Sequence, residues 1–432
     1  DRRKWIYGIL KFNKAKMTIQ AIYNESKNNF LFNNSKKFLN LREKIINNFD
    51  LSTKIKKNNE SLKHLDLQVL EFSYKYTKKF NNISYSDHED NKINVNIIDG
   101  NISTLQVNKD NNRDIEVNNI DNKNNLIEKI LLDFQNYFEN DYIFNLNSLM
   151  LNSGYEINVR KGSEANIFIN NTVSDKELTI FQKNYISCAK GSKVIIIEEF
   201  TTDKQSNNNV VNFFNIEEGA DVIHLIFQKN NLNANLQSTS FANCYRNSKY
   251  KQLTLNISKG SVRNHHYANL NGEGSSADFD GIFFASNNQV VDNKTQVNHN
   301  FPHCISSQRY KGILTDRAKA SYLSKTFVDR IAQKTEAYQL SKGILLSDYS
   351  YFHSKPELRI FADDVKCSHG STIGPIDKDL LFYLRSRGLS KKTSTSFLIK
   401  SFFHDIISKV HHKSFVEKFN YHSNIWLKDN NI

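Results

Sequence analysis

The pattern of apolar positions in the first third of the chain predicts helices around one short hairpin. Ser35 can act as the N-cap of a first helix, after which apolar residues recur at steps of three or four: Phe38, Leu41, Ile45 and Phe49. Around residues 93–107 the period falls to two, and Asp99-Gly100 supplies a turn, so a β-hairpin is expected there. A second amphipathic helix is expected from Leu126 to Phe138.

Residues 108–125 interrupt this pattern. They are dense in Asn and Asp and poor in apolar groups, so we expect a loose surface loop that packs against nothing. The pattern changes again near residue 140. We therefore assign residues 1–140 to a mostly helical N-terminal region that also holds the hairpin and the Asn-rich loop.

From residue 141 to residue 375 the sequence consists of short β-rich runs separated by turns that contain glycine. Five such glycines follow one another: Gly162, Gly191, Gly219, Gly260 and Gly274. Their intervals of about 29, 28, 41 and 14 residues are close to multiples of 14, as expected for a solenoid of strand-plus-turn units. The series stops after Gly274. The spacing alone supports a β-sandwich with surface turns equally well.

After Pro375 helical spacing returns, and we assign residues 376–432 to a C-terminal helical region. Asp377 can cap a helix that ends at Gly388, and Ser390 can begin another. The second helix carries an apolar stripe at four-residue steps: Leu398, Phe402, Ile406 and Val410. Either the protein's own core or a groove on a partner could cover this stripe.

Composition excludes several functions. The formal net charge is +13, but the lysines are spread among asparagines along the whole chain, so no nucleic-acid groove is expected. The four cysteines lie far apart without a C-x-x-C pair, which argues against zinc fingers and disulfides and favours a reducing compartment. The most apolar run, Val194 to Ile197, falls far short of the roughly 18 residues of a membrane helix, so a soluble protein is expected.

Motifs for nucleotide binding and hydrolysis are missing from the sequence. It holds no G-x-x-x-x-G-K-[ST] loop and no G-x-S-x-G elbow, so the chain is expected to have no ATP site of its own and no hydrolase serine. The carboxylates of Asp278, Asp280, Glu198 and Glu199 could serve as acid and base in a β-helix enzyme that cleaves polysaccharides. We regard that activity as the weaker alternative.

The segment from Asp363 to Gly370 carries the strongest chemical signal. On a strand, residues two apart share a face, so Cys367 and His369 would point the same way. A thiolate and an imidazole can hold iron or a cluster sulfur, although two ligands make only half of a site. Without further context, a buried cysteine beside a hydrogen-bonded histidine is the commoner meaning of such a pair.

Two other groups of metal-binding residue types are weaker. One comprises His299, His303 and Cys304, and the other is the pair His265 and His266. Neither has the spacing of H-E-x-x-H or of a zinc finger. Both groups could bind a metal ion, but each signal is weak by itself.

Short motifs from Gly272 to Gly388 occur in an order that resembles the SufB/SufD family of iron-sulfur cluster assembly scaffolds. The motifs are 271–274 (NGEG), 291–295 (VDNKT), 302–304 (PHC), 310–312 (YKG), 332–335 (AQKT), 345–348 (LLSD), 355–358 (KPEL), 362–370 (ADDVKCSHG) and 381–388 (LFYLRSRG). The residues of the last two motifs resemble the SufD branch more closely than SufB. The family pattern is weaker at 329–331 and in the first 90 residues, where the role of the chain stays open.

This resemblance implies a mainly β fold, a right-handed parallel β-helix flanked by N-terminal and C-terminal helical regions. It also implies a non-enzymatic scaffold that pairs with a SufB-like protein and docks the ATPase SufC, in the cytoplasm or the plastid stroma. Alone, such a chain could form a homodimer.

The resemblance further implies that His369, and less certainly Cys367, contribute to an interface where an iron-sulfur cluster forms transiently between this chain and SufB. The expected SufC-docking residues lie in the two C-terminal helices: Leu381, Tyr383, Leu384, Arg385, Leu398, Phe402 and Ile406. A SufB-like subunit that itself nucleates the cluster is a further alternative.

Overall fold

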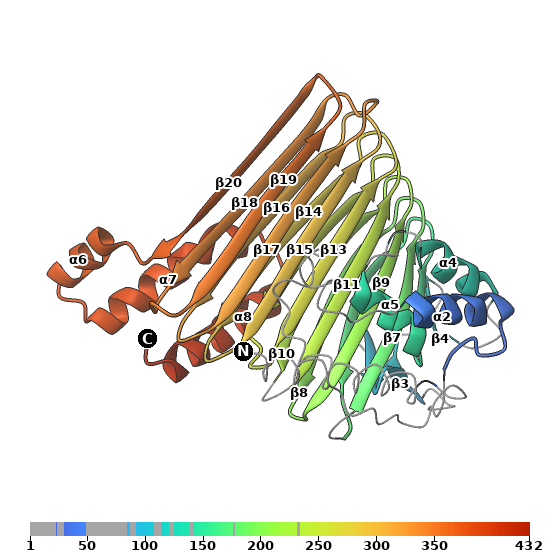
Figure 1. Ribbon diagram of the computed structural model, residues 1–432, viewed down its shortest axis with the longest axis horizontal. Coiled ribbons are helices and arrows are strands. Elements are labelled where there is room, and N and C mark those ends of the chain that lie inside the picture. The colour runs from blue at the N-terminus through green and yellow to red at the C-terminus, as the bar shows by residue number, and fades with distance from the viewer. Residues whose placement is uncertain are drawn as a thin grey trace, which may run out of the picture.

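The computed structural model of the protein describes residues 23, 30–48, 84–86, 92–107, 114–120, 125–135, 137, 141–175, 178–230 and 234–432. Within these residues two long sheets form an elongated body with helices near both ends (Figure 1). The eleven-stranded sheet has the order β1-β3-β2-β6-β8-β10-β12-β14-β16-β18-β20, and the nine-stranded sheet the order β19-β17-β15-β13-β11-β9-β7-β5-β4.

The strands are mostly eight to eleven residues long from β6 onward. Their bounds are β1 Ser84–Ser86, β2 Lys92–Ile98, β3 Asn101–Gln106, β4 Ile115–Asn119, β5 Tyr155–Val159, β6 Glu164–Thr172, β7 Leu178–Cys188, β8 Lys193–Thr202, β9 Ser206–Ile216, β10 Asp221–Asn230, β11 Asn235–Cys244, β12 Lys249–Asn256, β13 Val262–Leu270, β14 Ser276–Ala285, β15 Val290–His299, β16 Ile305–Leu314, β17 Lys319–Val328, β18 Thr335–Leu345, β19 Tyr351–Ile360 and β20 Val365–Pro375. The helices are α2 Lys36–Asn48, α4 Asn125–Gln135, α5 Tyr142–Met150, α6 Lys378–Ser386, α7 Lys391–Ile407 and α8 Lys413–Asp429.

From β5 to β20, successive strands alternate between the two sheets, and neighbours within a sheet pair in parallel. For example, β8 pairs with β10, and β9 pairs with β11. The chain therefore winds as a β-helix with two strands in each coil. The predicted mainly β fold, a parallel β-helix with helical regions at both ends, is confirmed, and the sandwich alternative is excluded.

The turns at one edge of the β-helix are bonded to one another from coil to coil. The amide of Gly191 donates to the carbonyl of Glu218 (3.0 Å), and the amide of Gly219 donates to that of Arg246 (2.9 Å). The φ angles of the two glycines are 70° and 68°, a left-handed conformation that costs a residue without Cβ little. A Cβ at either glycine would meet no atom within 4 Å, so backbone conformation alone favours glycine there.

The predicted glycine series mixed turns from two edges. Gly260 lies between β12 and β13, at the opposite edge, and its φ is not positive. At the first edge the left-handed position is taken by Asn247, His303 and Lys334 (φ 56°, 59° and 61°) where no glycine is present. The repeating unit is thus a coil of about 28 residues. The glycine positions alone do not reveal this period, because residues other than glycine also adopt the left-handed conformation in some coils.

Of the predictions for the N-terminal region, the first helix cap and the hairpin are confirmed and the loop is not. Ser35 caps α2, since its Oγ accepts from the amide of Phe38 (3.2 Å), and β2 and β3 form the expected antiparallel hairpin across Asp99-Gly100. The expected loop at residues 108–125 is wrong in its described part, because β4 pairs antiparallel with β5 there. Its Ile115 and Val117 are buried, so two apolar residues were enough to place a strand. Phe49, Phe138 and the rest of the Asn-rich segment lie outside the described residues.

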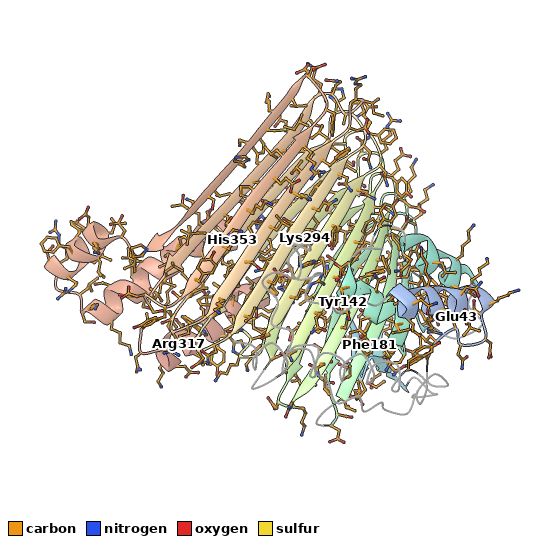
Figure 2. The ribbon with its side chains drawn as sticks, viewed as in Figure 1. Glu43, Tyr142, Phe181, Lys294, Arg317 and His353 are labelled. Atoms are coloured by element: carbon orange, nitrogen blue, oxygen red, sulfur yellow. The ribbon has the colours of Figure 1, made fainter. Side chains whose placement is uncertain are left out.

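Helices cover the outer faces of both sheets. α2, α4 and α5 pack on the nine-stranded sheet, where Phe134 stacks on Phe213 at 4.1 Å between ring centroids. α7 and α8 pack on the eleven-stranded sheet, where Phe403 and Trp426 contact Phe284. In Figure 2, Tyr142 of α5 marks the covered part of the nine-stranded sheet, and Lys294 and His353 lie farther along it. The last coil extends beyond the N-terminal helical layer.

Candidate functional site

β20 is the last strand of the eleven-stranded sheet and places Cys367 and His369 on one face. Cys367 pairs with Ala337 and His369 pairs with Gln339, both of β18. Ala337 and Gln339 are buried between the two sheets, so Cys367 and His369 face the same interior. His369 is nevertheless exposed, because no further coil follows in the described chain. The prediction that the two residues share a strand face is confirmed.

The side chains beneath His369 are held by the protein itself. The amide oxygen of Gln339 accepts from Ser324 Oγ (3.1 Å), and its Nε2 donates to Thr326 Oγ1 (2.8 Å) and to the Glu357 carbonyl (3.3 Å). The imidazole of His369 makes no hydrogen bond or ion pair with any residue that the structure describes, although its backbone is part of the ladder with β18. Its ring nitrogens are therefore available to a ligand or partner outside this chain.

Cys367 is in a different environment from His369. It is half-buried and packs with Val365 against Val328, Ala332 and Ala362. Burial raises the pKa of the Cys367 thiol, although a backbone hydrogen bond at Ala337 partly offsets this. Since the thiolate is the form that binds metals, Cys367 is a weaker ligand than His369 in this chain alone.

No group of three or more His, Cys, Asp or Glu side chains converges on a metal-sized site among the described residues. Cys367 and His369 can supply two donors at most. An iron-sulfur cluster needs about four ligands, so the remaining ligands would have to come from outside this strand. The geometry is that of a partial site at an open end.

His265 and His266 do not form a joint site, because adjacent residues on a strand face opposite ways. His265 lies on the outer face, with Nε2 3.0 Å from Asp292 and Nδ1 3.7 Å from Asp141, the N-cap of α5. His266 lies inside, with Nδ1 2.7 Å from Ser240 Oγ. Burial, then His224 and His265, lower the pKa of His266 well below its usual value, so it is a neutral core residue.

The group of His299, His303 and Cys304 is also structural. His299 is buried and bonded to Ser306 Oγ (2.8 Å), and burial lowers its pKa to about 3. His303 occupies a left-handed turn position, while Cys304 is buried beside Ser275 Oγ (3.5 Å). These side chains do not converge.

The four carboxylates considered for polysaccharide cleavage lie on two sides of one sheet. Glu198 is inside, where it accepts from Asn212 Nδ2 (2.9 Å) and lies 3.1 Å from His224 Nε2. Glu199, on the outer face, pairs with Lys418 of α8. Asp278 and Asp280 are also on the outer face. No single groove holds all four, and of the pair that shares one cavity, Asp280 is bound through both oxygens by Arg309.

The predicted docking residues differ in accessibility. Tyr383 is 54% exposed, whereas Ile406 is 1% exposed and packs on the eleven-stranded sheet. Leu381, Leu384, Leu398 and Phe402 are half-buried, and Arg385 is exposed. Lys311 Nζ donates to the Phe402 carbonyl (2.6 Å), which fixes this part of α7 to the sheet. For Ile406 the geometry therefore favours the alternative of packing within the protein.

Sequence reasoning missed the most exposed apolar side chains of this region. Phe382 is 73% exposed, Phe397 55% and Leu380 52%. α6 buries none of its residues, and Figure 1 shows it projecting from the end of the body. The sequence did hold a signal: α6 carries apolar residues on more than one side. A helix that packs on a core with one face needs only one apolar stripe, so the extra apolar residues indicate exposed positions.

None of the helices in the described ranges combines the length and the apolar character needed to cross a lipid bilayer.

Comparison with known proteins gives a consistent result. Residues 139–402 match the sequence model described as "SUF system FeS cluster assembly, SufBD core domain". A SufBD family iron-sulfur cluster assembly protein of Synechocystis is 32% identical over 203 residues, covering 47% of this chain and 45% of its own. Escherichia coli SufD is 29% identical over 237 residues, covering 52% and 53%. The chloroplastic protein ABCI7 of Arabidopsis thaliana is 27% identical over 229 residues, covering 52% and 48%.

The matched part thus spans about half the length of these curated relatives. The match to the family model, residues 139–402, contains the chain from α5 to β20, α6 and most of α7.

Proposed function

The chain belongs to the SufBD family of iron-sulfur cluster assembly proteins, and we propose that it acts as a SufD-like scaffold subunit rather than as an enzyme. The observation that carries this proposal is the family match over the β-helix, taken together with an open last coil that presents His369. On this proposal the chain pairs with a SufB-like protein, docks the ATPase SufC, and shares a transient iron-sulfur cluster with SufB.

The last coil is suited to pairing with another subunit. β19 and β20 each end their sheet among the described strands, so each leaves an edge with unpaired backbone groups. Exposed apolar side chains lie at the same end, with Ile360 37% and Phe361 58% exposed. A second β-helix placed against this end would bury them and bring its own side chains to His369.

The partial metal site has a simple meaning in this arrangement. His369, with Cys367 as the weaker candidate, would supply one side of the site, and the SufB-like subunit the other. A site divided between subunits forms and opens as the interface changes. That property suits a cluster that is built and then passed on.

The C-terminal helices are the proposed contact for SufC. Tyr383 and Arg385, from the expected set, are exposed on α6, and the neighbouring Phe382 and Phe397 add apolar surface. Aromatic and Arg side chains are the residues most often found at the energetic centre of protein interfaces. Because the sequence has no P-loop, ATP hydrolysis is assigned to the partner.

The relatives named above include a bacterial SufD and a chloroplastic protein. The compartment we propose is correspondingly the cytoplasm or, for a plastid-bearing source, the plastid stroma.

Co-expression tests this function. This chain is produced with SufB-like and SufC-like proteins of the same source, and the mass, iron and sulfide of the purified species are measured. We expect a complex of all three proteins that binds iron and sulfide under reducing conditions. A chain that purifies alone and iron-free would contradict the scaffold function, and iron and sulfide bound by this chain alone would favour a SufB-like nucleating role.

A further inference from the structure

A cavity of about 450 Å³ lies between the outer face of the eleven-stranded sheet and residues 406–412, where α7 ends and α8 begins. Its volume falls within the range of small-molecule sites in proteins. It is separate from the last coil, because its walls come from β8, β10, β12, β14 and β16. The proposed scaffold function makes no use of it.

One side of the cavity floor, on the outer face of the sheet, is apolar. Ile195, Ile223, Leu225 and Leu253 come from three adjacent strands and lie in two neighbouring rows of the pairing register. Farther along the same face, apolar residues such as Phe284 are covered by α7 and α8. Here only the end of α7 and the linker pass over the sheet, so space remains above the apolar floor.

Toward β14 and β16, the same sheet face carries an ion pair and a second carboxyl. Arg309 donates to both carboxylate oxygens of Asp280 (2.7 and 2.5 Å), so each charge has a matched partner. Asp278, two residues before Asp280 on the same face of β14, is half-buried and makes no hydrogen bond within the described chain. Burial, then the nearby Asp280, raise the pKa of Asp278 above its usual value.

Cations also line the cavity, but on its solvent side. Lys251 and Lys409 are exposed, as is His411, whereas Asp278 and Asp280 are partly covered. Water screens the exposed lysines, so their attraction for an anion is weak. An anionic group placed beside Asp278 would meet its unpaired carboxyl next to the Asp280–Arg309 ion pair, whereas an amine there would gain a charge-assisted hydrogen bond to Asp278.

We propose that this cavity is a binding site for a small amphipathic amine, whose apolar body lies on Ile195, Ile223 and Leu225 and whose ammonium group binds Asp278. A bound molecule would contact both the sheet and the α7–α8 linker. Occupancy would therefore hold the linker against the sheet.

Three probes with the same six-carbon chain test the charge preference: n-hexylamine, 1-hexanol and hexanoate. Their binding to the full chain at neutral pH is measured by ligand-observed saturation-transfer NMR titration. We expect n-hexylamine to bind about tenfold more tightly than hexanoate, with 1-hexanol between them, as one charge-assisted hydrogen bond predicts.

The variant Asp278→Asn should weaken n-hexylamine binding by about tenfold and leave 1-hexanol binding nearly unchanged. Asp348→Asn is the matched control, because Asp348 is exposed in the turn between β18 and β19, and it should change neither. Ile223→Trp should fill the cavity and abolish binding of all three probes. Hexanoate binding at least as tight as that of the amine, unchanged amine affinity in Asp278→Asn, or no binding of any probe would each overturn the proposal.

Discussion

At the scale of single residues, His369 and Cys367 show how position decides chemistry. Both face the interior of the β-helix at its last coil, yet His369 is exposed and Cys367 packs into a small apolar cluster. The imidazole is available to a partner without any rearrangement of the fold. A buried thiol must first lose contacts and a proton before it can bind metal.

The variant His369→Ala should retain the fold and the three-protein complex but lose most of the iron and sulfide bound at the interface. An exposed side chain without hydrogen bonds contributes little to stability, so the free energy of unfolding should change by less than about 0.5 kcal/mol. Ser368→Ala is the matched control, since Ser368 is its exposed neighbour on the opposite face. Unchanged iron and sulfide in purified His369→Ala complexes would remove His369 from the site.

Lys183 gives a second prediction at this scale. It is fully buried under α5, donates to Ser148 Oγ (2.6 Å) and lies 4.1 Å from the centre of the Phe144 ring. Burial, with a contribution from Arg42, lowers its pKa from 10.5 to about 7. Between these values the unfolded chain binds a proton that the folded chain does not, so Lys183 makes stability rise with pH over this window.

Lys183→Met should remove that rise, which is on the order of a few kcal/mol between pH 7 and pH 9.5. Denaturant unfolding of wild type and variant at several pH values measures the difference between their free energies of unfolding. Titration of groups other than Lys183 contributes equally to both proteins and cancels in this difference. The exposed Lys193 provides the control Lys193→Met, which should keep the wild-type slope. An unchanged slope in Lys183→Met would contradict the assignment.

At the scale of elements, α6 and α7 differ in what their apolar side chains contact. The inner side of α7 packs Phe403 and Ile406 on the eleven-stranded sheet, and Lys311 fastens it through Asp405 (2.5 Å). α6 has no fully buried residue, and it keeps Leu380, Phe382 and Tyr383 exposed to solvent. Both helices have apolar residues in sequence, and only the contacts in the fold separate the packed side of α7 from the exposed side chains of α6.

Charge substitutions should distinguish the exposed side chains of α6 and α7 from the side of α7 that packs on the sheet. Phe382→Glu and Phe397→Glu should weaken SufC binding in calorimetric titration by at least about tenfold, with melting temperatures close to wild type. Ile406→Glu should instead destabilise the protein by several kcal/mol, because it places an unpaired charge in the core. Phe382→Glu and Phe397→Glu variants that both bind SufC normally would rule out this docking surface.

At the scale of the whole molecule, the β-helix is closed along its sides and open at its last coil. Helices from both ends of the chain cover part of each side, on opposite sheets (Figure 1). The last coil keeps two strand edges and the exposed Ile360 and Phe361. On the function proposed above, this end would associate with another β-helix, either a SufB-like partner or, when the chain is alone, a second copy.

Ile360→Arg should therefore abolish pairing with the SufB-like protein, and also any homodimer, without a loss of stability. The residue is more than one third exposed and ends β19, so the charge remains in solvent in the free chain. Light scattering after size-exclusion chromatography gives the mass of each species. Lys355→Glu, on the outer face of the same strand, is a control that should still pair.

Much of the fold follows from local sequence. The hairpin at Asp99-Gly100, the caps at Ser35, Asp377 and Ser390, and the placement of Cys367 and His369 on one face of β20 all depend on residues within a few positions of one another. Turn chemistry, capping and side-chain periodicity act over that range. The order of family motifs added the β-helix, which spacing could not separate from a sandwich.

The remaining features depend on contacts between distant segments. Asn247, His303 and Lys334 take glycine's place because hydrogen bonds from adjacent coils hold their turns, and β4 forms because β5 offers a partner. Tertiary packing also buries Ile406, exposes Phe397, and leaves a cavity beside Asp278. The sequence by itself determined most of the strands and helices, because those preferences are local, and β4 is the exception that needed its partner β5. Tertiary structure alone decided which faces are buried, since burial depends on neighbours that lie tens of residues away in the chain.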